Sequence, residues 1–370
     1  MTDLGTAVGA TLGVEEEYHL VDAVTGALAD APQVVEEGER RFGAQVQSEI
    51  STAQLEIGTP VCSTLGEVRA SLRRLRAGAA AVAAESGVAV LACGTHPFGT
   101  WRDQRLTGGE RYVRLHERWG LLALQQLITG THVHVSVPDP ELAIQVLDRL
   151  RPDLPTLLAM SGSSPYWEGS DTGYASFRTQ WYARFSVTGM PEVFGSRAAY
   201  DETVAALVRA GIADDASHLY WDARPATRYP TLEVRVGDTM PRLDDAVLHA
   251  GLARALVQQA AEDALAGLPV PALRPEVARA ARWRAARHGL EGELVDCRSG
   301  ALVPAAELVH GLVARVRPQL ERTGDLAEVC ALTEATLARG TSARRQRELM
   351  ARTGDLAQVV HALVAEAQQG

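Results

Sequence analysis

The sequence predicts an α+β protein, and three observations support this class. Four stretches in the first two thirds of the chain alternate between apolar and polar residues, which is the period of a half-buried strand. Helical patterns, marked by capping residues and glycines, are interspersed between these strands. From Leu243 onward the pattern is mostly helical. We therefore expect one domain over residues 1–370, with a mostly helical part from about residue 243.

The first predicted strand, Thr11 to Asp22, holds three consecutive glutamates inside an otherwise buried pattern. Neighbouring carboxylates on one face lie about 7 Å apart. They repel each other unless water, arginine or a divalent cation neutralises them. Alone, this strand would fit the solvated face of an antiparallel sheet equally well. Alternation places Leu12, Val14, Tyr18 and Leu20 on one face, and Glu15, Glu17 and His19 on the other.

Three more strands repeat this two-faced pattern: Gln54 to Pro60, Ile128 to Pro138 and Thr231 to Asp238. Each puts side chains that bind metals or anions on its polar face. A sheet containing all four strands would gather these groups on one surface, which outlines a metal and phosphate site. The surface would carry Glu15, Glu17, Glu56, Glu233, His132, His134 and Arg235.

The donor atoms of this surface are mostly carboxylate oxygens, with imidazole as a minority and no cysteine. Such a set suits Mg²⁺ or Mn²⁺ better than zinc or copper. Mg²⁺ usually reaches a protein through few carboxylates and completes its shell with water and substrate phosphates, so this many acids indicate more than one ion. The residues favour a multi-metal phosphoryl-transfer site. A hydrolytic metal site and a merely polar sheet face remain as alternatives.

Helices and turns connect the predicted strands. Val24 to Leu28 fits a hairpin turn, and Gln33 to Phe42 reads as a short helix. Thr64 to Ser86 is a clear helix, with a capping box formed by Thr64 and Glu67 and with Gly87 at its end. Further elements are a buried strand at Val88 to Ala92, a loop anchored by His96, a helical run within Gly108 to Gln126 and two helices within Pro138 to Met160.

One acid needs a special position. Glu49 and Glu56 are seven residues apart, so on a single strand they would face opposite sides. Glu49 must therefore lie on a preceding turn or bulge if both acids face one ion.

Ser161 to Phe185 is a long polar and aromatic stretch without clean periodicity, and we expect a loop over the site. Arg178 lies in it among aromatic residues that can pack a guanidinium and direct it at an anion. A strand at Leu219 to Arg224 should precede the last two-faced strand. The helices that follow are expected at Leu243 to Leu268, Pro275 to His288, Ala305 to Leu320, Leu326 to Ala338 and in the tail.

Composition excludes several classes of protein. All 36 basic residues are arginine, so a Walker lysine, a Schiff-base lysine and a kinase-type lysine are absent. A net charge of −10 argues against a nucleic-acid surface. No stretch reaches the roughly 20 apolar residues of a membrane span. The N-terminus does not resemble a signal peptide, and we expect a cytoplasmic protein. Cys62, Cys93, Cys297 and Cys330 are expected to be reduced core or surface residues.

At the four two-faced strands the chain resembles a known family. GVEEE, QLEIGTP, TGTHVHVSVP and LEVRVGD, in this order, are similar to the glutamate-cysteine ligase type 2 family of bacterial ATP-dependent carboxylate-amine ligases. Its distant relatives are gamma-glutamylcysteine synthetase and glutamine synthetase. The resemblance implies a curved, mainly antiparallel sheet whose polar face forms a funnel, with helices outside. It continues at Cys93 to Phe98, Tyr174 to Phe185, Arg282 to Gly292 and Gly340 to Glu348.

The resemblance also implies roles for individual residues. Metals that hold ATP would be bound by Glu15, Glu17, Glu49, Glu56, His132 and Glu233. Arg235 would contact the transferred phosphate, and Arg178 would hold a substrate carboxylate or phosphate. Weaker candidates for substrate or nucleotide binding are His134, Ser176, Arg284 and Arg344. In two places the chain departs from distant relatives, which tend to carry an amide at His134 and can carry arginine at Glu16.

The expected function is ATP-dependent ligation. A carboxylate such as glutamate would be activated as an acyl phosphate and joined to an amine, such as the amino group of cysteine or another amino acid, with release of ADP and phosphate. ATP and Mg²⁺ or Mn²⁺ would be the cofactors. We expect small-molecule carboxylate and amine substrates and neither nucleic acid nor a membrane as a partner. A homodimer is one assembly that the chain could form. A metal-dependent hydrolase using His132 and His134, and a non-catalytic metal-stabilised scaffold, are the alternatives.

Overall fold

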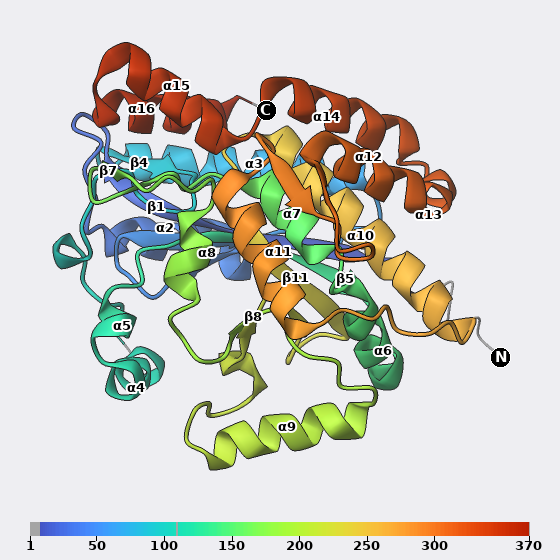
Figure 1. Ribbon diagram of the computed structural model, residues 1–370. Coiled ribbons are helices and arrows are strands. Elements are labelled where there is room, and N and C mark those ends of the chain that lie inside the picture. Colours follow the sequence, from blue (N-terminus) through green and yellow to red (C-terminus); the bar gives the residue numbers. More distant parts are fainter. Residues whose placement is uncertain (1–7, 109, 370) are drawn as a thin grey trace.

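The computed structural model describes residues 8–108 and 110–369 (Figure 1). Its centre is a seven-stranded sheet with the order β10-β11-β5-β1-β3-β2, in which β4 also pairs with β1. Every pair in it is antiparallel, which confirms the predicted α+β class and sheet type. The strands are β1 (Leu12–Asp22), β2 (Val46–Ser48), β3 (Gln54–Gly58), β4 (Val88–Leu91), β5 (Gly130–Ser136), β10 (Ala223–Pro225) and β11 (Thr231–Asp238).

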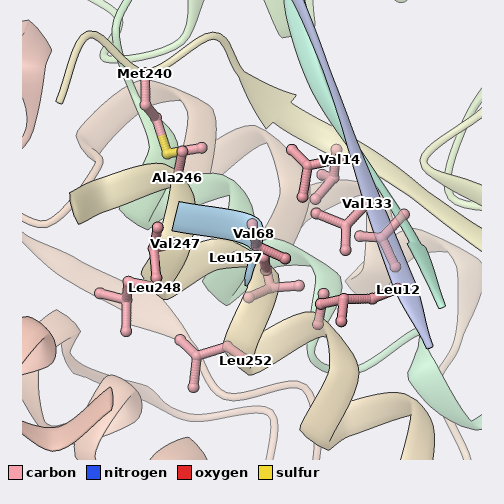
Figure 2. Close-up of a cluster of buried hydrophobic side chains, with 14 of the residues drawn as sticks. Leu12, Val14, Val68, Val133, Leu157, Met240, Ala246, Val247, Leu248 and Leu252 are labelled. Atoms are coloured by element: carbon pink, nitrogen blue, oxygen red, sulfur yellow. The ribbon is translucent and has the colours of Figure 1, made fainter. Parts of the chain in front are cut away.

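Helices pack on the apolar face of this sheet. In Figure 2, Leu12, Val14 and Val133 from the sheet lie in one buried cluster with side chains from α3, α7 and α10. Because side chains alternate along the strands, the apolar residues of the sheet all lie on one face, and this face forms part of the hydrophobic core. The helices on this side include α3 (Leu65–Ala84), α6 (Pro140–Leu150), α7 (Leu154–Ser161) and α10 (Leu243–Leu265).

Helix α3 begins at the predicted cap. The Thr64 hydroxyl accepts a hydrogen bond from the Glu67 amide at 3.1 Å. The Glu67 carboxylate accepts from the Ser63 amide at 2.7 Å rather than from the Thr64 amide, so the reciprocal half of the predicted capping box is shifted by one residue. Both bonds still satisfy amides at the start of the helix.

Glu16 lies on the apolar face, between the two glutamates of the polar face. Its carboxylate pairs with the buried guanidinium of Arg76 on α3, at 2.9 Å from Arg76 Nε. The Tyr18 hydroxyl donates to the same carboxylate. The departure from distant relatives at Glu16 therefore concerns the core beneath the sheet and not the substrate side.

The C-terminal part is mostly helical, as predicted, and several of its helices lie together along one side of the molecule, at the top of Figure 1. The prediction of one helix from Ala305 to Leu320 was wrong. The chain breaks at Val316 because Pro318, in the first turn of the next helix, cannot continue a helix through its own position. The helices are α11 (Pro275–His288), α12 (Ala305–Arg315), α13 (Arg317–Thr323), α14 (Leu326–Arg339), α15 (Ser342–Thr353) and α16 (Leu356–Gln368).

Several small elements were not predicted. Ser161 to Phe185 is not one loop, because it contains the hairpin β6 (Tyr166–Trp167) and β7 (Ser170–Asp171) and the helix α8 (Phe177–Tyr182). The other elements that were not predicted are the hairpin of β12 (Glu293–Val295) and β13 (Leu302–Pro304), the strand β8 (Thr188–Gly189), the helix α9 (Arg197–Arg209) and the 3₁₀ turns η1 (Gly43–Gln45), η2 (Trp101–Asp103) and η3 (Ala216–His218).

The remaining elements agree with predictions. The helix α2 (Pro32–Phe42) is the one expected at Gln33 to Phe42, and α4 (Glu110–Trp119) and α5 (Leu121–Leu124) lie in the helical run expected within Gly108 to Gln126. The strand expected at Leu219 to Arg224 is divided into β9 (Tyr220–Trp221), which pairs in parallel with β8, and β10.

Three further predictions concern the whole chain. The four cysteines are free, and three of them are buried, which fits their expected role as core or surface residues. Over the described residues, no helix has both the length and the apolar character that crossing a bilayer requires. That residues 1–370 form one catalytic domain stays a prediction.

Candidate active site

The register of the sheet brings the predicted ligands together. Glu15 on β1 lies opposite His132 on β5, and Glu17 lies opposite Glu56 on β3. His134 on β5 lies opposite Glu233 on β11. Directly opposed residues in an antiparallel pair have Cβ atoms about 5 Å apart, so every pair is within reach of one ion.

These side chains form three overlapping groups of donors. Within each group the ligand atoms lie within 4.8 Å of one another. Glu15 belongs to two groups and Glu56 to two, so the donors form a continuous row rather than three separate sites. The groups are Glu15, His134 and Glu233; Glu15, Glu56 and His132; and Glu17, Glu49 and Glu56.

Glu49 reaches this row from outside the sheet, as the parity argument required. It follows the end of β2 and precedes β3. The Ile50 amide donates to the Glu49 carboxylate at 2.9 Å, and the Thr107 hydroxyl donates to the Glu49 carbonyl. The connection between the strands therefore turns Glu49 toward Glu17 and Glu56.

The pKa values of the carboxyl groups are shifted in opposite directions at the two ends of the row. Burial and the Glu49 charge raise the pKa of Glu17 to about 8, and burial with the charge of Glu15 raises the pKa of Glu56 well above its ordinary value. At the other end, burial acts to raise the pKa of Glu233, but Arg235 and Arg224 outweigh it and hold that pKa low. The charges of Arg178 and Arg235 act to lower the pKa of Glu17 but do not outweigh its burial, so a divalent cation would further stabilise the ionised carboxylates at this end. This oxygen-rich set fits Mg²⁺ or Mn²⁺.

The pKa values of the two histidines are also shifted in opposite directions. Burial, together with the charge of Arg235, lowers the pKa of His132 to about 4, so its ring is neutral at pH 7 and able to bind a metal. Burial also acts against the charged form of His134, but its hydrogen bond with Glu15 and the charges of Glu15 and Glu233 together outweigh burial and raise its pKa. His134 Nε2 lies 3.4 Å from Glu15, and Nδ1 lies 3.0 Å from the Thr231 hydroxyl.

Arginine borders the row on β10 and β11. Arg235 pairs with Glu233. It lies in an irregular part of β11, between Val234 and Gly237, where the register with β5 shifts by one residue. Arg224 lies opposite Glu233 and donates from Nε to its carboxylate at 2.9 Å. Glu233 is thus held by two guanidinium groups.

A cavity of about 810 Å³ opens over this row. The six predicted metal ligands, His134 and Arg235 all line it, together with side chains of α9 and of the loop from Ala226 to Pro230. Such a volume is in the range of ligand sites in enzymes. The structure thus brings eight of the predicted site residues to one cavity.

The chain matches the model of Glutamate-cysteine ligase family 2 (GCS2) over residues 11–362. The chain belongs to the glutamate-cysteine ligase type 2 family. It is 44% identical over 371 residues to a protein of Frankia alni assigned as glutamate–cysteine ligase 2-2, with 96% of each chain covered. It is 43% identical to the protein of Mycolicibacterium smegmatis with the same assignment, over 96% of this chain and 89% of that one. The expected family is confirmed, and the chain is a ligase.

Solved structures show the same fold. The glutamate–cysteine ligase of Francisella tularensis, determined in complex with AMP, superposes with a TM-score of 0.71 at 14% identity and covers 98% of this chain and 90% of that one. A bifunctional glutathione synthetase from Pasteurella multocida also gives 0.71, at 17% identity, over 99% of this chain and 53% of that one. At these identities the likeness concerns the fold.

In this glutamate-cysteine ligase type 2 family member a smaller cavity, of about 110 Å³, adjoins the large one. Glu17, Glu49, His132, Tyr220 and Arg235 line both. The smaller cavity also reaches Arg178 and His218, so it contains the second predicted catalytic arginine.

Arg178 is placed by its neighbours on α8 and by a glycine on β5. Ser176 caps α8, accepting from the Thr179 amide at 3.4 Å, and donates to the buried Asp238 at 2.7 Å. Arg178 Nη1 lies 4.0 Å from Asp238. A Cβ on Gly130 would lie 2.2 Å from Arg178 Nη2, so the guanidinium packs directly against this glycine. Ser176 thus positions Arg178 and does not line either cavity.

Two of the weaker candidates lie away from both cavities. Arg284 donates from Nε to the Glu293 carbonyl at 2.7 Å, and Arg344 pairs with Glu348 at 2.8 Å on α15. Neither lines the cavities described here.

Sequence reasoning missed Arg224 and His218. Arg224 lies on a short strand, where alternation gives the face of its side chain but not its partner. Only the register of β10 and β11 shows that it lies opposite Glu233. His218 lies in the 3₁₀ turn η3, for which the sequence offers an aspartate cap at Asp215 and no periodicity.

Proposed function

We propose that this ligase activates a carboxylate substrate with ATP as an acyl phosphate and joins it to an amine, releasing ADP and phosphate. The observation that carries the proposal is the continuous row of three donor groups, bordered by Arg235 and opening into a cavity of about 810 Å³. Glutamate is the proposed acid, and cysteine or another amino acid is the proposed amine, by analogy with the assigned activity of the relatives.

Each part of the site has a task in this reaction. The row of carboxylates and imidazoles would hold Mg²⁺ or Mn²⁺, which when bound neutralises the charge of the ATP phosphates. Arg235 lines both cavities and would stabilise charge on the phosphoryl group during transfer. Arg178 would hold the acid substrate in the smaller cavity. Acyl phosphate formation supplies the leaving group that a carboxylate lacks.

The family resemblance implies six metal ligands, and His134 is a proposed seventh. It shares a donor group with Glu15 and Glu233. Its Nδ1 contacts the Thr231 hydroxyl at 3.0 Å, which would leave Nε2 to face the ion.

The test is ADP release with ATP and Mg²⁺ against a panel of amino acids and amines, with the amide product followed by mass spectrometry. Release that requires both an acid and an amine supports the proposal, and Glu15→Gln and Glu233→Gln should abolish it. Glu334→Gln is the matched control, because Glu334 is an exposed glutamate on α14 that pairs with His310. Metal-dependent hydrolysis without ATP consumption would instead indicate a hydrolase. Size-exclusion chromatography would check the predicted homodimer.

A further inference from the structure

Tyr182 contacts both arginines of the smaller cavity. It is the last residue of α8 and lines this cavity together with Arg178 and Arg235. The central carbon of the Arg178 guanidinium lies 5.5 Å from the centre of the Tyr182 ring. The Tyr182 hydroxyl accepts a hydrogen bond from the Arg235 side chain. One side chain therefore connects two arginines that belong to different elements, α8 and β11.

The sequence of α8 explains the contact with Arg178. Arg178 and Tyr182 are four residues apart, which places both side chains on one face of the helix. A guanidinium within about 6 Å of the centre of an aromatic ring is attracted to the face of that ring, and more strongly away from water. The Tyr182 ring also packs against the ring of Tyr220 on β9, with 5.8 Å between the ring centres. Two elements therefore hold the surface on which Arg178 rests.

The contact with Arg235 is made by a neutral phenol. Burial raises the pKa of Tyr182, although the charges of Arg235 and Arg178 act to lower it, so the hydroxyl keeps its proton at pH 7. A guanidinium can only donate hydrogen bonds, and the phenol oxygen accepts one from it. Glu233 pairs with Nη1 of the same guanidinium. Arg235 is therefore held by a carboxylate of its own strand and by a phenol of α8.

Both arginines keep a donor that no protein group uses. The Nε atoms of Arg178 and Arg235 are buried and have no hydrogen-bond partner among the residues that the structure describes. A buried donor without a partner costs about 1–3 kcal/mol, so such groups are rare away from binding sites. Two guanidinium groups of this kind at one cavity fit the binding of anionic substrate groups.

We propose that Tyr182 is a positioning residue that fixes the acid-binding Arg178 relative to Arg235, which contacts the transferred phosphoryl group; this rests on the ligase reaction proposed above. The attacking carboxylate oxygen must come within about 3–3.5 Å of the phosphorus atom before transfer. This approach depends on the separation of the two guanidinium groups, and Tyr182 contacts both. Its ring supports acid binding through Arg178, and its hydroxyl supports the transfer step through Arg235.

Two variants remove the contacts one at a time. Tyr182→Phe keeps the ring beside Arg178 and loses only the hydroxyl that contacts Arg235, whereas Tyr182→Leu loses both contacts. The assay supplies ATP, Mg²⁺, L-glutamate and hydroxylamine, which traps an acyl phosphate as a hydroxamate. The measured rate therefore does not depend on the identity of the natural amine. For each variant, kcat and the KM for L-glutamate are determined separately.

The proposal predicts a different pattern for each variant. In Tyr182→Phe we expect kcat to fall by a factor of about 10 to 100, because Arg235 is displaced, with the KM for L-glutamate within about twofold of wild type. In Tyr182→Leu we expect the same fall in kcat and a rise of about fivefold or more in this KM. Tyr174→Phe is the matched control and should change neither value, because the Tyr174 hydroxyl contacts Trp283 at 3.1 Å and lines neither cavity.

Other outcomes have clear meanings. An unchanged kcat in Tyr182→Phe overturns the proposal, and so does an equal KM for L-glutamate in Tyr182→Phe and Tyr182→Leu. If wild type forms no hydroxamate and releases no ADP with L-glutamate, the ligase reaction proposed for glutamate is wrong and the role of Tyr182 fails with it. Thermal unfolding checks that each variant folds. Should Tyr182→Leu not fold, Tyr182→Met takes its place under the same criteria, and Tyr182→Phe still decides the role of the hydroxyl.

Discussion

Glu16 and Glu17 are neighbours on β1, yet only Glu17 faces the row of proposed metal ligands. Glu16 is fully buried on the opposite face and pairs with Arg76 of α3, whose side chain is 5% exposed. Arg76 also donates to the carbonyls of Met240 and Pro241, at 2.9 and 2.6 Å. Of two adjacent acids in one motif, Glu16 therefore belongs to the core, and Glu17 is the proposed metal ligand.

Replacement of these two glutamates should affect different properties, stability for Glu16 and metal binding for Glu17. Glu16→Leu leaves the Arg76 charge buried without its carboxylate, and we expect a loss of about 3–5 kcal/mol in the free energy of unfolding. Glu17→Gln removes a carboxyl whose pKa is raised to about 8 by burial and by Glu49, so the metal-free protein should lose no stability at pH 7. Its Mn²⁺ binding should weaken. Urea unfolding and Mn²⁺ titration measure both effects, and equal destabilisation by the two changes would contradict the assignment.

Gly130 should be required for the position of Arg178. In Gly130→Ala the new Cβ would meet Arg178 Nη2 at 2.2 Å, so the guanidinium must move. A displacement of about 1 Å at a substrate-holding group costs up to about 100-fold in rate. We expect the catalytic efficiency with the acid substrate to fall by a factor of about 10 to 100. Gly311→Ala is the control, because nothing lies within 4 Å of its Cβ, and an unchanged efficiency in Gly130→Ala would show that Arg178 does not hold the acid.

Arg224 should contribute more to stability than a typical arginine. Arg224→Met would leave Glu233 short of one cation and three carbonyls of the η3 region without this donor. We expect a loss of about 3 kcal/mol or more in the free energy of unfolding. Arg344→Met breaks only an exposed pair with Glu348 and should cost less than about 1 kcal/mol. Unfolding of both variants in guanidinium chloride measures the two losses of stability. Similar losses would contradict the structural role that we assign to Arg224.

Buried histidine predicts how stability depends on pH. Burial lowers the pKa of His249 on α10 to about 4, while the unfolded chain has an ordinary value of about 6.5. Because the unfolded state binds the proton first as pH falls, the stability that this group contributes is present above pH 6.5. It is lost between about pH 6.5 and 4, at about 1.4 kcal/mol per pH unit.

The variant His249→Leu tests this dependence. The free energy of unfolding of wild type should fall as the pH is lowered over that range. In the variant, the slope of this free energy against pH should be smaller by about 1.4 kcal/mol per pH unit, which corresponds to one proton. Urea unfolding at several pH values measures the slope. An unchanged slope would mean that His249 does not titrate as its burial predicts.

The sequence by itself determined which residues lie on which face of each strand. Alternation is a local property with a period of two, so the acidic face of β1 and the His132 and His134 face of β5 could be predicted without any contact between strands. The capping signal at Thr64 was equally local. Even Glu49 was constrained, because parity required it to lie off the strand of Glu56 if both acids were to face one ion.

Only the tertiary structure decided which of these residues meet. Strand register is set by long-range packing, and it placed Arg224 against Glu233 and divided seven donors into three overlapping groups. The pairing of Glu16 with Arg76 joins residues 60 positions apart, and η3 brings His218 to the cavity by hydrogen bonds to Arg224. A local pattern shows which way a side chain points, but its partner depends on the folding of the whole chain.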